Sequence, residues 1–282
     1  MQLLADLWRS VWRHPVKTVG LIYLAFSSLF TLIQAVNFFD SKIKFEGIIF
    51  LFGLIAVSLI FSLWMIWKPS TVDIAIKHTN TTIKISFGDI FSCPGLKLIS
   101  VNNFFDSSIG RPVSDRSLHG IFINRAFGGH PQSLDSQLDQ QLATVAFEEV
   151  SEKIEGKNKA YAIGTTAAID VSGDKYILFA LTKSDPATCK ANSDVTLMWV
   201  ALHGAWQRAR IEAGGHDVNI PLVGSGLAGL GLPTRDLLNL IILSAITETK
   251  ASEITRTIRI VIHRERYDEV DLRDLRKHWE ND

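Results

Sequence analysis

Two long uncharged stretches lie within the first seventy residues of this 282-residue chain. They constrain its fold more than any other feature. Residues 18–39 and 48–67 contain no charged side chain and are mostly apolar. As helices rising about 1.5 Å per residue they reach about 33 and 30 Å, which matches a hydrocarbon core of about 30 Å. Only a helix pairs its own backbone groups in lipid, so we expect a transmembrane hairpin joined by the short link 40–47.

Two other interpretations of these stretches are weaker. Two core helices of a soluble protein are seldom this long and apolar with a short charged link between them. A cleaved signal peptide would be shorter than residues 18–39, would end in a small-x-small cleavage site, and would not be followed by a second apolar stretch. We therefore assign residues 1–69 to a membrane anchor and residues 70–282 to a separate domain.

Basic side chains around the hairpin predict its orientation. Six of them flank the hairpin and two lie in its link: Arg9, Arg13, Lys17, Lys68, Lys77 and Lys84, against Lys42 and Lys44. Positive charge favours the cytoplasmic side, so we expect both termini, and the domain after residue 70, in the cytoplasm. Apolar residues at helical spacing within 3–16 predict either a helix along the membrane surface or an extension of the first span.

Composition excludes several classes of protein. The chain has 29 basic and 29 acidic residues, which gives no overall positive field for nucleic acid. Its two cysteines, Cys93 and Cys189, cannot form a disulfide framework and fit a reducing compartment. The eight histidines show no paired spacing typical of a metal site, so we expect no metal.

After residue 70 the pattern alternates between short β-branched runs and longer helical repeats. We predict strands at 72–77, 81–87, 96–101, 161–166, 175–181, 218–223 and 257–262, and helices at 133–153, 195–213, 234–247 and 271–280. Thr234, after a proline, is the predicted N-cap of the third helix. This alternation indicates an α/β fold, a three-layer α/β/α sandwich with a mixed, largely parallel sheet.

The richest stretch for function is the glycine-containing loop at 224–231. An apolar strand precedes it and a helix follows, so its backbone N–H groups can turn toward an anionic ligand. A dinucleotide-binding unit would place an acidic residue at the end of the next strand, where this chain has His263 and Arg264. The alternatives that remain are a phosphate-binding loop and a tight turn with no ligand.

Two further motifs end strands. Gly88-Asp89-Ile90 follows one strand, and its carboxylate can accept a hydrogen bond from an amino group or cap a turn. Asn102 and Asn103 follow the next strand, where amides can bind ribose hydroxyls or form a turn.

The order of these three features resembles the macro domain, an ADP-ribose-binding fold, over about residues 72–265. In that family the aspartate of the Gly-Asp-Ile motif recognises adenine, an asparagine after the next strand contacts the distal ribose, and the late glycine loop wraps the diphosphate. The resemblance implies these ligand-binding residues: Asp89, Ile90, Asn102 or Asn103, Gly224, Ser225, Gly226, Leu227, Ala228 and Gly229.

A narrower resemblance rests on the two spans, the Asn-x-Phe-Phe-Asp segment at 102–106 and the Ser-Leu-His-Gly segment at 117–120. Together these are similar to the ThsA-type membrane effectors of type II Thoeris anti-phage systems. This resemblance implies a multi-pass protein of the bacterial inner membrane that senses an ADP-ribose derivative made from NAD by a TIR-domain enzyme. Histidine-ADP-ribose is one candidate. On sensing it, the protein would form homo-oligomers and disrupt the membrane.

The chain departs from the macro-domain pattern in its asparagine motif, which only Asn102 or Asn103 can match, and in the loop that follows. The glycine triplet that hydrolytic members use to position water is absent, and residues 110–120 stand in its place. We therefore expect ligand binding with no catalytic residue and no cofactor, and the alternative is a membrane-tethered ADP-ribosyl hydrolase. Asp106 and His119 are added as ligand-binding candidates, and each could instead stabilise its loop.

Overall fold

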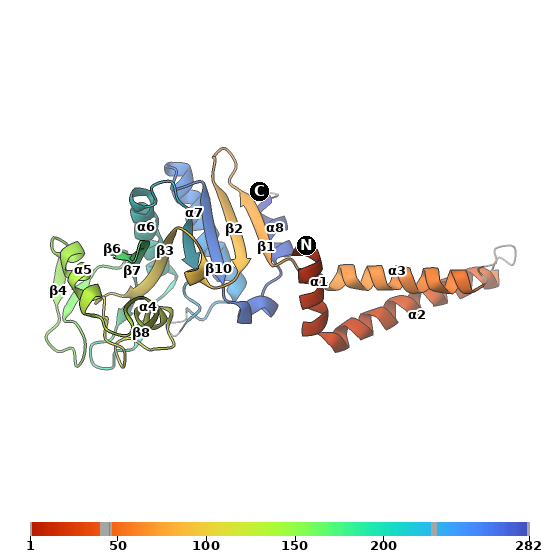
Figure 1. The fold of residues 1–282 in the computed structure, drawn as a ribbon, viewed down its shortest axis with the longest axis horizontal. Coiled ribbons are helices and arrows are strands. Elements are labelled where there is room, and N and C mark those ends of the chain that lie inside the picture. The colour runs from red at the N-terminus through yellow and green to blue at the C-terminus, as the bar shows by residue number, and fades with distance from the viewer. Residues whose placement is uncertain (1, 40–44, 46, 227–229, 281–282) are drawn as a thin grey trace. The chain divides into compact units, whose positions relative to one another are not determined.

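The computed structural model describes residues 2–39, 45, 47–226 and 230–280. The chain divides into two compact units, Met1–Ser70 and Thr71–Asp282. Figure 1 colours the first unit red to orange and the second yellow to blue.

The first unit consists of helices α1 (Gln2–Arg13), α2 (Pro15–Phe39) and α3 (Ile48–Ile66). The chain bends at His14, and Pro15 begins α2, because a proline has no N–H to lose at the first position of a helix. Residues 2–13 are therefore a helix of their own and do not extend α2. The Asp6 carboxylate accepts a hydrogen bond from the Ser70 amide at 3.1 Å, which ties α1 to the end of the unit.

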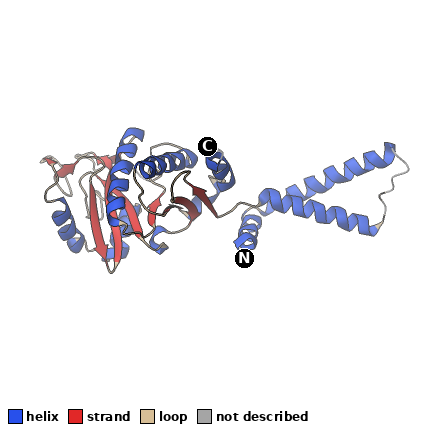
Figure 2. Cartoon of the chain, turned by 90° about the horizontal axis from the view of Figure 1, so that it is seen from above, coloured by secondary structure: helices blue, strands red, loops and turns tan. Residues whose placement is uncertain are grey.

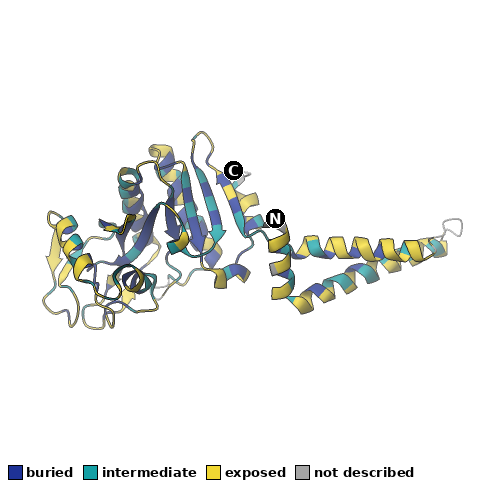
Figure 3. Ribbon diagram, viewed as in Figure 1, coloured by how far each residue is buried: buried dark blue, intermediate teal, exposed yellow. Residues whose placement is uncertain are grey.

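Helices α2 and α3 are long and apolar enough to cross a membrane. Only 6% of the apolar window of α2 and 17% of that of α3 is buried, whereas a core helix of a soluble protein is mostly buried (Figure 3). The two helices are therefore candidate membrane spans. They pack against each other, and their buried side chains are Thr18, Ala25, Leu54, Ser58, Ser62 and Ile66, three of which carry a hydroxyl.

Within the described part of the second unit, eight strands form one mixed sheet in the order β1-β2-β10-β9-β3-β7-β6, with β8 paired to β7. The strands are β1 (Thr71–Ala75), β2 (Thr82–Phe87), β3 (Leu96–Asn102), β6 (Thr166–Val171), β7 (Asp174–Ser184), β8 (Ala191–Asn192), β9 (Val218–Pro221) and β10 (Thr257–Ile262). The pairings from β2 through β10, β9 and β3 to β7 are parallel, while β1, β6 and β8 pair antiparallel. A separate ribbon joins β4 (Phe147–Glu149) to β5 (Lys159–Tyr161).

Helices cover both faces of the sheet (Figure 2). Alternate residues of the strands enter two cores, so that Leu98 of β3 and Phe179 of β7 lie in one and Ile99 and Leu178 in the other. Helices α6 (Val195–Glu212), α7 (Thr234–Ala251) and α8 (Leu272–Glu280) close the first core, and α4 (Leu118–Phe127) and α5 (Gln132–Leu142) close the second. The predicted three-layer sandwich with a mixed sheet is confirmed.

Three local predictions were wrong, and one helix was not predicted. The helix predicted at 133–153 ends at Leu142, and the chain continues through a turn into β4, although Val145 and Phe147 continue the apolar repeat. The strand predicted at 161–166 is not continuous: residues 162–165 form a turn between β5, which ends at Tyr161, and β6, which begins at Thr166. No helix was predicted at α4, which follows a loop without a helical pattern. Helix α7 begins at Thr234, so Pro233 is its N-cap, and the Thr234 hydroxyl bonds instead to Glu269.

Candidate functional site

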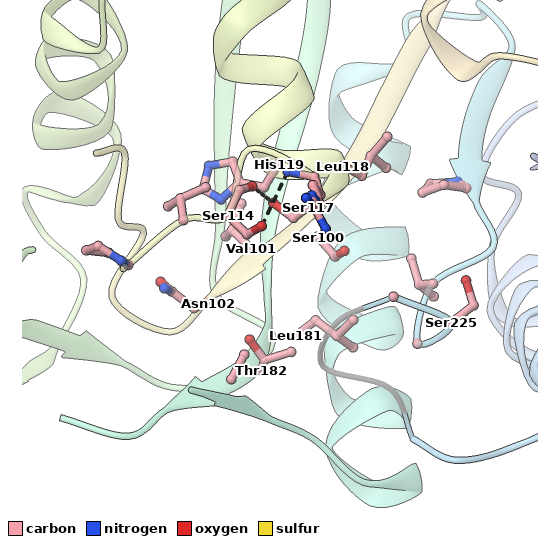
Figure 4. Close-up of a pocket in the computed structure, with 18 of the residues that line it drawn as sticks. Ser100, Val101, Asn102, Ser114, Ser117, Leu118, His119, Leu181, Thr182 and Ser225 are labelled. Atoms are coloured by element: carbon pink, nitrogen blue, oxygen red, sulfur yellow. Dashed lines mark hydrogen bonds between the residues drawn. The ribbon is translucent and has the colours of Figure 1, made fainter. Parts of the chain in front are cut away.

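A cavity of about 780 Å³ opens at the carboxyl ends of β3, β7 and β9, near the middle of the sheet (Figure 4). Parallel strands bind ligands at this edge, and the volume is that of a small-molecule site. Four segments line the cavity: the end of β3 at 100–102, the loop into α4 at 111–119, residues 181–182 and 189–191 around β8, and the loop after β9 at 221–226.

The charge of the lining favours an anion. Arg111, Arg116 and Lys190 line the cavity, and the described part of the lining contains no carboxylate. Neither arginine forms an ion pair with a described residue, so their guanidinium groups can pair with an incoming anion. Among the described residues, no three His, Cys, Asp or Glu side chains group closely enough to hold a metal ion.

The wall formed by residues 114–120 is a capped helix start. Ser117 is the N-cap of α4, since its hydroxyl accepts a hydrogen bond from the Gly120 amide at 3.0 Å. The same hydroxyl donates to the Ser114 carbonyl oxygen at 2.6 Å (dashed in Figure 4). A Cβ atom at Gly120 would lie 2.2 Å from that carbonyl oxygen, so only glycine allows the loop to fold back over the helix. The Ser-Leu-His-Gly segment therefore holds its third member, His119, at the cavity.

His119 is a neutral imidazole with an unused hydrogen-bonding atom. The side chain lines the cavity and is 6% exposed, and its buried Nε2 has no hydrogen-bond partner among the described residues. Burial, and then the charge of Lys157, lowers the pKa of His119 to about 3. Because an unpaired buried polar atom is costly, Nε2 is available to a polar group of a ligand.

The opposite wall is the glycine loop, with Ser225 on the other side of the cavity from Asn102 in Figure 4. Gly224 has φ +80°, and a Cβ atom there would lie 2.7 Å from the Leu230 side chain. A Cβ atom at Gly226 would meet no described atom within 4 Å. The Ser225 carbonyl oxygen accepts a hydrogen bond from Arg266 at 2.8 Å, which fixes the loop from far along the chain. The predicted ligand residues Leu227, Ala228 and Gly229 lie outside the described residues.

Asn102 lines the cavity, but most of its amide is used inside the protein. Its Oδ1 accepts hydrogen bonds from the amides of Phe104 and Asp106, and its Nδ2 donates to the Asp106 carboxylate at 2.9 Å. One amide N–H of Asn102 remains for a ligand. Asp106 itself is fully buried outside the lining and pairs with Lys153 at 2.7 Å. The geometry favours a positioning role for Asp106 and not a ligand contact.

Three other predicted ligand residues lie outside the lining. Asn103 accepts a hydrogen bond from the Ser184 amide, and Ile90 packs into the core beneath α4 and α5. Asp89 caps the short helix η1 (Ile90–Ser92) and pairs with Arg125 at 2.6 Å. Partial burial alone would raise the pKa of Asp89, but hydrogen bonds from Arg125 and the Phe91 amide lower it overall. Asp89 is therefore an ionised acceptor at neutral pH.

The structure brings residues to the site that the sequence analysis did not single out. Arg111, Arg116 and Lys190 supply its charge, and Thr182 and Cys189 supply part of its floor. The two arginines could have been predicted as site residues, because they are positively charged and lie in the loop 110–120 that already contained the candidate His119. No local pattern marks Lys190, Thr182 or Cys189, which the antiparallel pairing of β7 with β8 places at the site.

Comparison with known proteins shows that most of the second unit matches a protein family. Residues 83–263 match the family model described as Thoeris protein ThsA, Macro domain. That segment covers β2 to β10 and contains the whole described lining of the cavity. No curated protein matches the chain.

Solved structures show the same fold. A macrodomain of Oceanobacillus iheyensis with ADP is 11% identical, with a TM-score of 0.53, over 75% of this chain and 98% of that one. A mutant of the same macrodomain with ADPR is 12% identical, with a TM-score of 0.52, over 74% of this chain and 99% of that one. The second unit therefore has the macro-domain fold.

Proposed function

Because this chain belongs to the Thoeris ThsA macro-domain family, we propose that it is a membrane-anchored effector of an anti-phage system, whose cavity senses an ADP-ribose-type signal. A TIR-domain enzyme would supply that signal from NAD. Binding would drive homo-oligomerisation and disruption of the bacterial inner membrane, and histidine-ADP-ribose is one candidate for the signal.

One observation supports an anionic ligand above all. The cavity places Arg111, Arg116 and Lys190 around a space without a carboxylate in its described lining. A diphosphate is a strong partner for such a site, because arginine pairs with phosphate oxygens in bidentate geometry. The macrodomain neighbours with ADP or ADPR support the same class of ligand.

The walls suggest how the ligand lies. The loop at Gly224–Gly226 offers backbone N–H groups without side chains, which suits the diphosphate. His119 and the remaining N–H of Asn102, at the other wall, suit hydroxyl groups of the distal ribose. Asp89 remains the proposed acceptor for the adenine amino group, and it must exchange or share its contact with Arg125.

We propose binding without turnover. Ribosyl hydrolysis needs a base to activate water, and His119, with a pKa of about 3, is a weak base at neutral pH. The alternative, a membrane-tethered ADP-ribosyl hydrolase, would need a base that the described lining does not supply.

Calorimetry with ADP-ribose tests the proposal, using the full chain in lipid nanodiscs. We expect one molecule bound per chain, and chromatography of the same sample after a day should recover the ligand intact. The matched pair of variants is Arg116→Gln, at the cavity, and Arg256→Gln, at an exposed position away from it. Equal affinity of both variants for ADP-ribose would place the ligand elsewhere, and release of ribose products would favour the hydrolase.

A further inference from the structure

Helix α2 has a polar face that its partner α3 does not cover. Five residues spaced three or four apart lie on one side of the helix: Gly20, Tyr23, Ser27, Thr31 and Gln34. We call these residues the α2 polar face. Tyr23 is 73% exposed, and Thr31 and Gln34 are exposed as well. The residues of α2 buried in the hairpin, Thr18 and Ala25, lie about half a turn away from this face.

Helix α3 differs in that its polar side chains are buried, although Thr31 of α2, like the α3 serines, donates its hydroxyl to the carbonyl oxygen one turn earlier, that of Ser27. Its serines, Ser58 and Ser62, are fully buried in the hairpin seam, and each donates a hydrogen bond to a carbonyl oxygen one turn earlier. Its exposed face consists of large apolar side chains such as Ile49, Phe52 and Ile60. The α3 surface is thus suited to lipid, whereas α2 exposes the polar side chains of Tyr23 and Gln34.

The depth of Gln34 makes this difference important. Gln34 is seven residues, or about 10 Å, from the middle of α2, so a spanning α2 places it within the hydrocarbon region. Its amide makes no hydrogen bond with any described residue. Lipid chains cannot bond an amide, so polar side chains in a span face protein or water.

We propose that copies of this chain associate in the membrane through the α2 polar face. A glutamine amide both donates and accepts, so Gln34 residues of two symmetry-related copies can pair with each other. Glycine, serine and threonine on the same face allow helices to approach closely. This inference rests on the proposed function: it takes α2 to span the membrane, and it assigns an interface to the homo-oligomer proposed there.

Disulfide cross-linking in proteoliposomes tests the interface. Ser27→Cys places an isosteric thiol on the α2 polar face, and the matched control Ile60→Cys places one on the exposed face of α3. Oxidation should give several-fold more disulfide-linked dimer with the first variant, and the unmodified chain measures the background from Cys93 and Cys189. Equal cross-linking of the two variants would overturn the proposal.

A second measurement does not depend on cysteines. Gln34→Leu, which lipid tolerates, should weaken self-association about three- to tenfold in energy-transfer measurements, as expected for one interhelical hydrogen bond. Ser28→Ala, outside the α2 polar face, should leave it unchanged. Adducts with a different protein in native membranes, without homodimers, would assign the face to that protein and overturn the proposal.

Two controls separate this inference from the proposed function. Release of the chain by alkaline carbonate would refute its membrane placement and, with it, the interface. Retention in the membrane without cross-linking at Ser27→Cys would refute the interface alone, and ADP-ribose affinity, measured on the same sample, would still decide the ligand.

Discussion

Replacing His119 by leucine gives a prediction that the structure makes quantitative. The folded protein holds the pKa of His119 at about 3, because the ring is buried and Lys157 is near, while the unfolded chain has a value of about 6.5. Below pH 6.5 the unfolded chain binds a proton that the folded protein does not. Stability from the neutral ring is therefore fully present above pH 6.5 and is lost as the pH falls toward 3.

The expected loss follows from that gap. Each pH unit between 6.5 and 3 costs about 1.4 kcal/mol, so lowering the pH from 8 to 5 removes about 2 kcal/mol from the free energy of unfolding. His119→Leu has no ring to protonate, so its free energy of unfolding should not fall by this amount between pH 8 and pH 5. At pH 8 the variant should be at least as stable as the parent, because it also removes the unpaired Nε2.

Urea unfolding of residues 71–282 at pH 8 and pH 5 measures the effect, since this unit has its own cores. The control is His130→Gln, an exposed histidine whose replacement should leave the pH dependence unchanged. ADP-ribose should bind His119→Leu about tenfold more weakly, the value of one hydrogen bond. If the parent and His119→Leu lose the same free energy between pH 8 and 5, the ring is not held neutral and the reasoning fails.

Other changes test other parts of the protein. Arg111→Gln should lower the affinity for ADP-ribose about tenfold and reduce the salt dependence of binding. If calorimetry at two salt concentrations shows no change in affinity, Arg111 does not contribute to the binding site. Gly226→Val, whose Cβ atom meets no described atom within 4 Å, should abolish binding with little change in melting temperature, and retained affinity would remove the loop from the site. Asp89→Ala should weaken ADP-ribose more than ribose 5-phosphate, and equal losses would contradict an adenine contact. Leu54→Asp, in the buried seam of the hairpin, should stop membrane disruption but spare ADP-ribose binding, and normal cell killing would contradict the effector role.

Six of the eight strands in the described sheet, all except β6 and β8, could be predicted from the sequence because they carry a local signal. Residues 257–262 and 218–223 are largely apolar runs, and the structure makes 257–262 and 218–221 neighbouring parallel strands. The capped start of α4 carried a signal as well, in Ser117 and in the glycine that ends the helix at Gly128. It was missed because Gly120, inside the helix, reads as a breaker, whereas the structure needs it for the close approach of Ser114.

The polar network behind the site could not be predicted, because its members are far apart in sequence. Asp106 meets Lys153, 47 residues later, and Ser225 meets Arg266, 41 residues later. No periodicity connects such pairs, so the sequence leaves open whether Asp106 contacts the ligand or stabilises its loop, and the ion pair with the buried Lys153 favours the second role. The sequence pattern also could not distinguish Asn102 from Asn103, which are adjacent in the chain. In the structure Asn102 lines the cavity, whereas Asn103 faces β7.

A weak contact between spans is what a ligand-controlled effector requires. Hydrogen bonds between helices in membranes contribute about 0.6 kcal/mol each, so the α2 polar face alone would hold few copies together at low abundance. A signal that prefers the assembled state about 100-fold adds about 2.7 kcal/mol per chain, several times one such contact. The cavity, and not the span, would then decide when the chains assemble. A variant with a stronger span contact, such as Ser27→Asn, should accordingly assemble and damage membranes without ADP-ribose. If membrane damage by this variant still requires ADP-ribose, the contact between spans does not contribute to the assembly equilibrium.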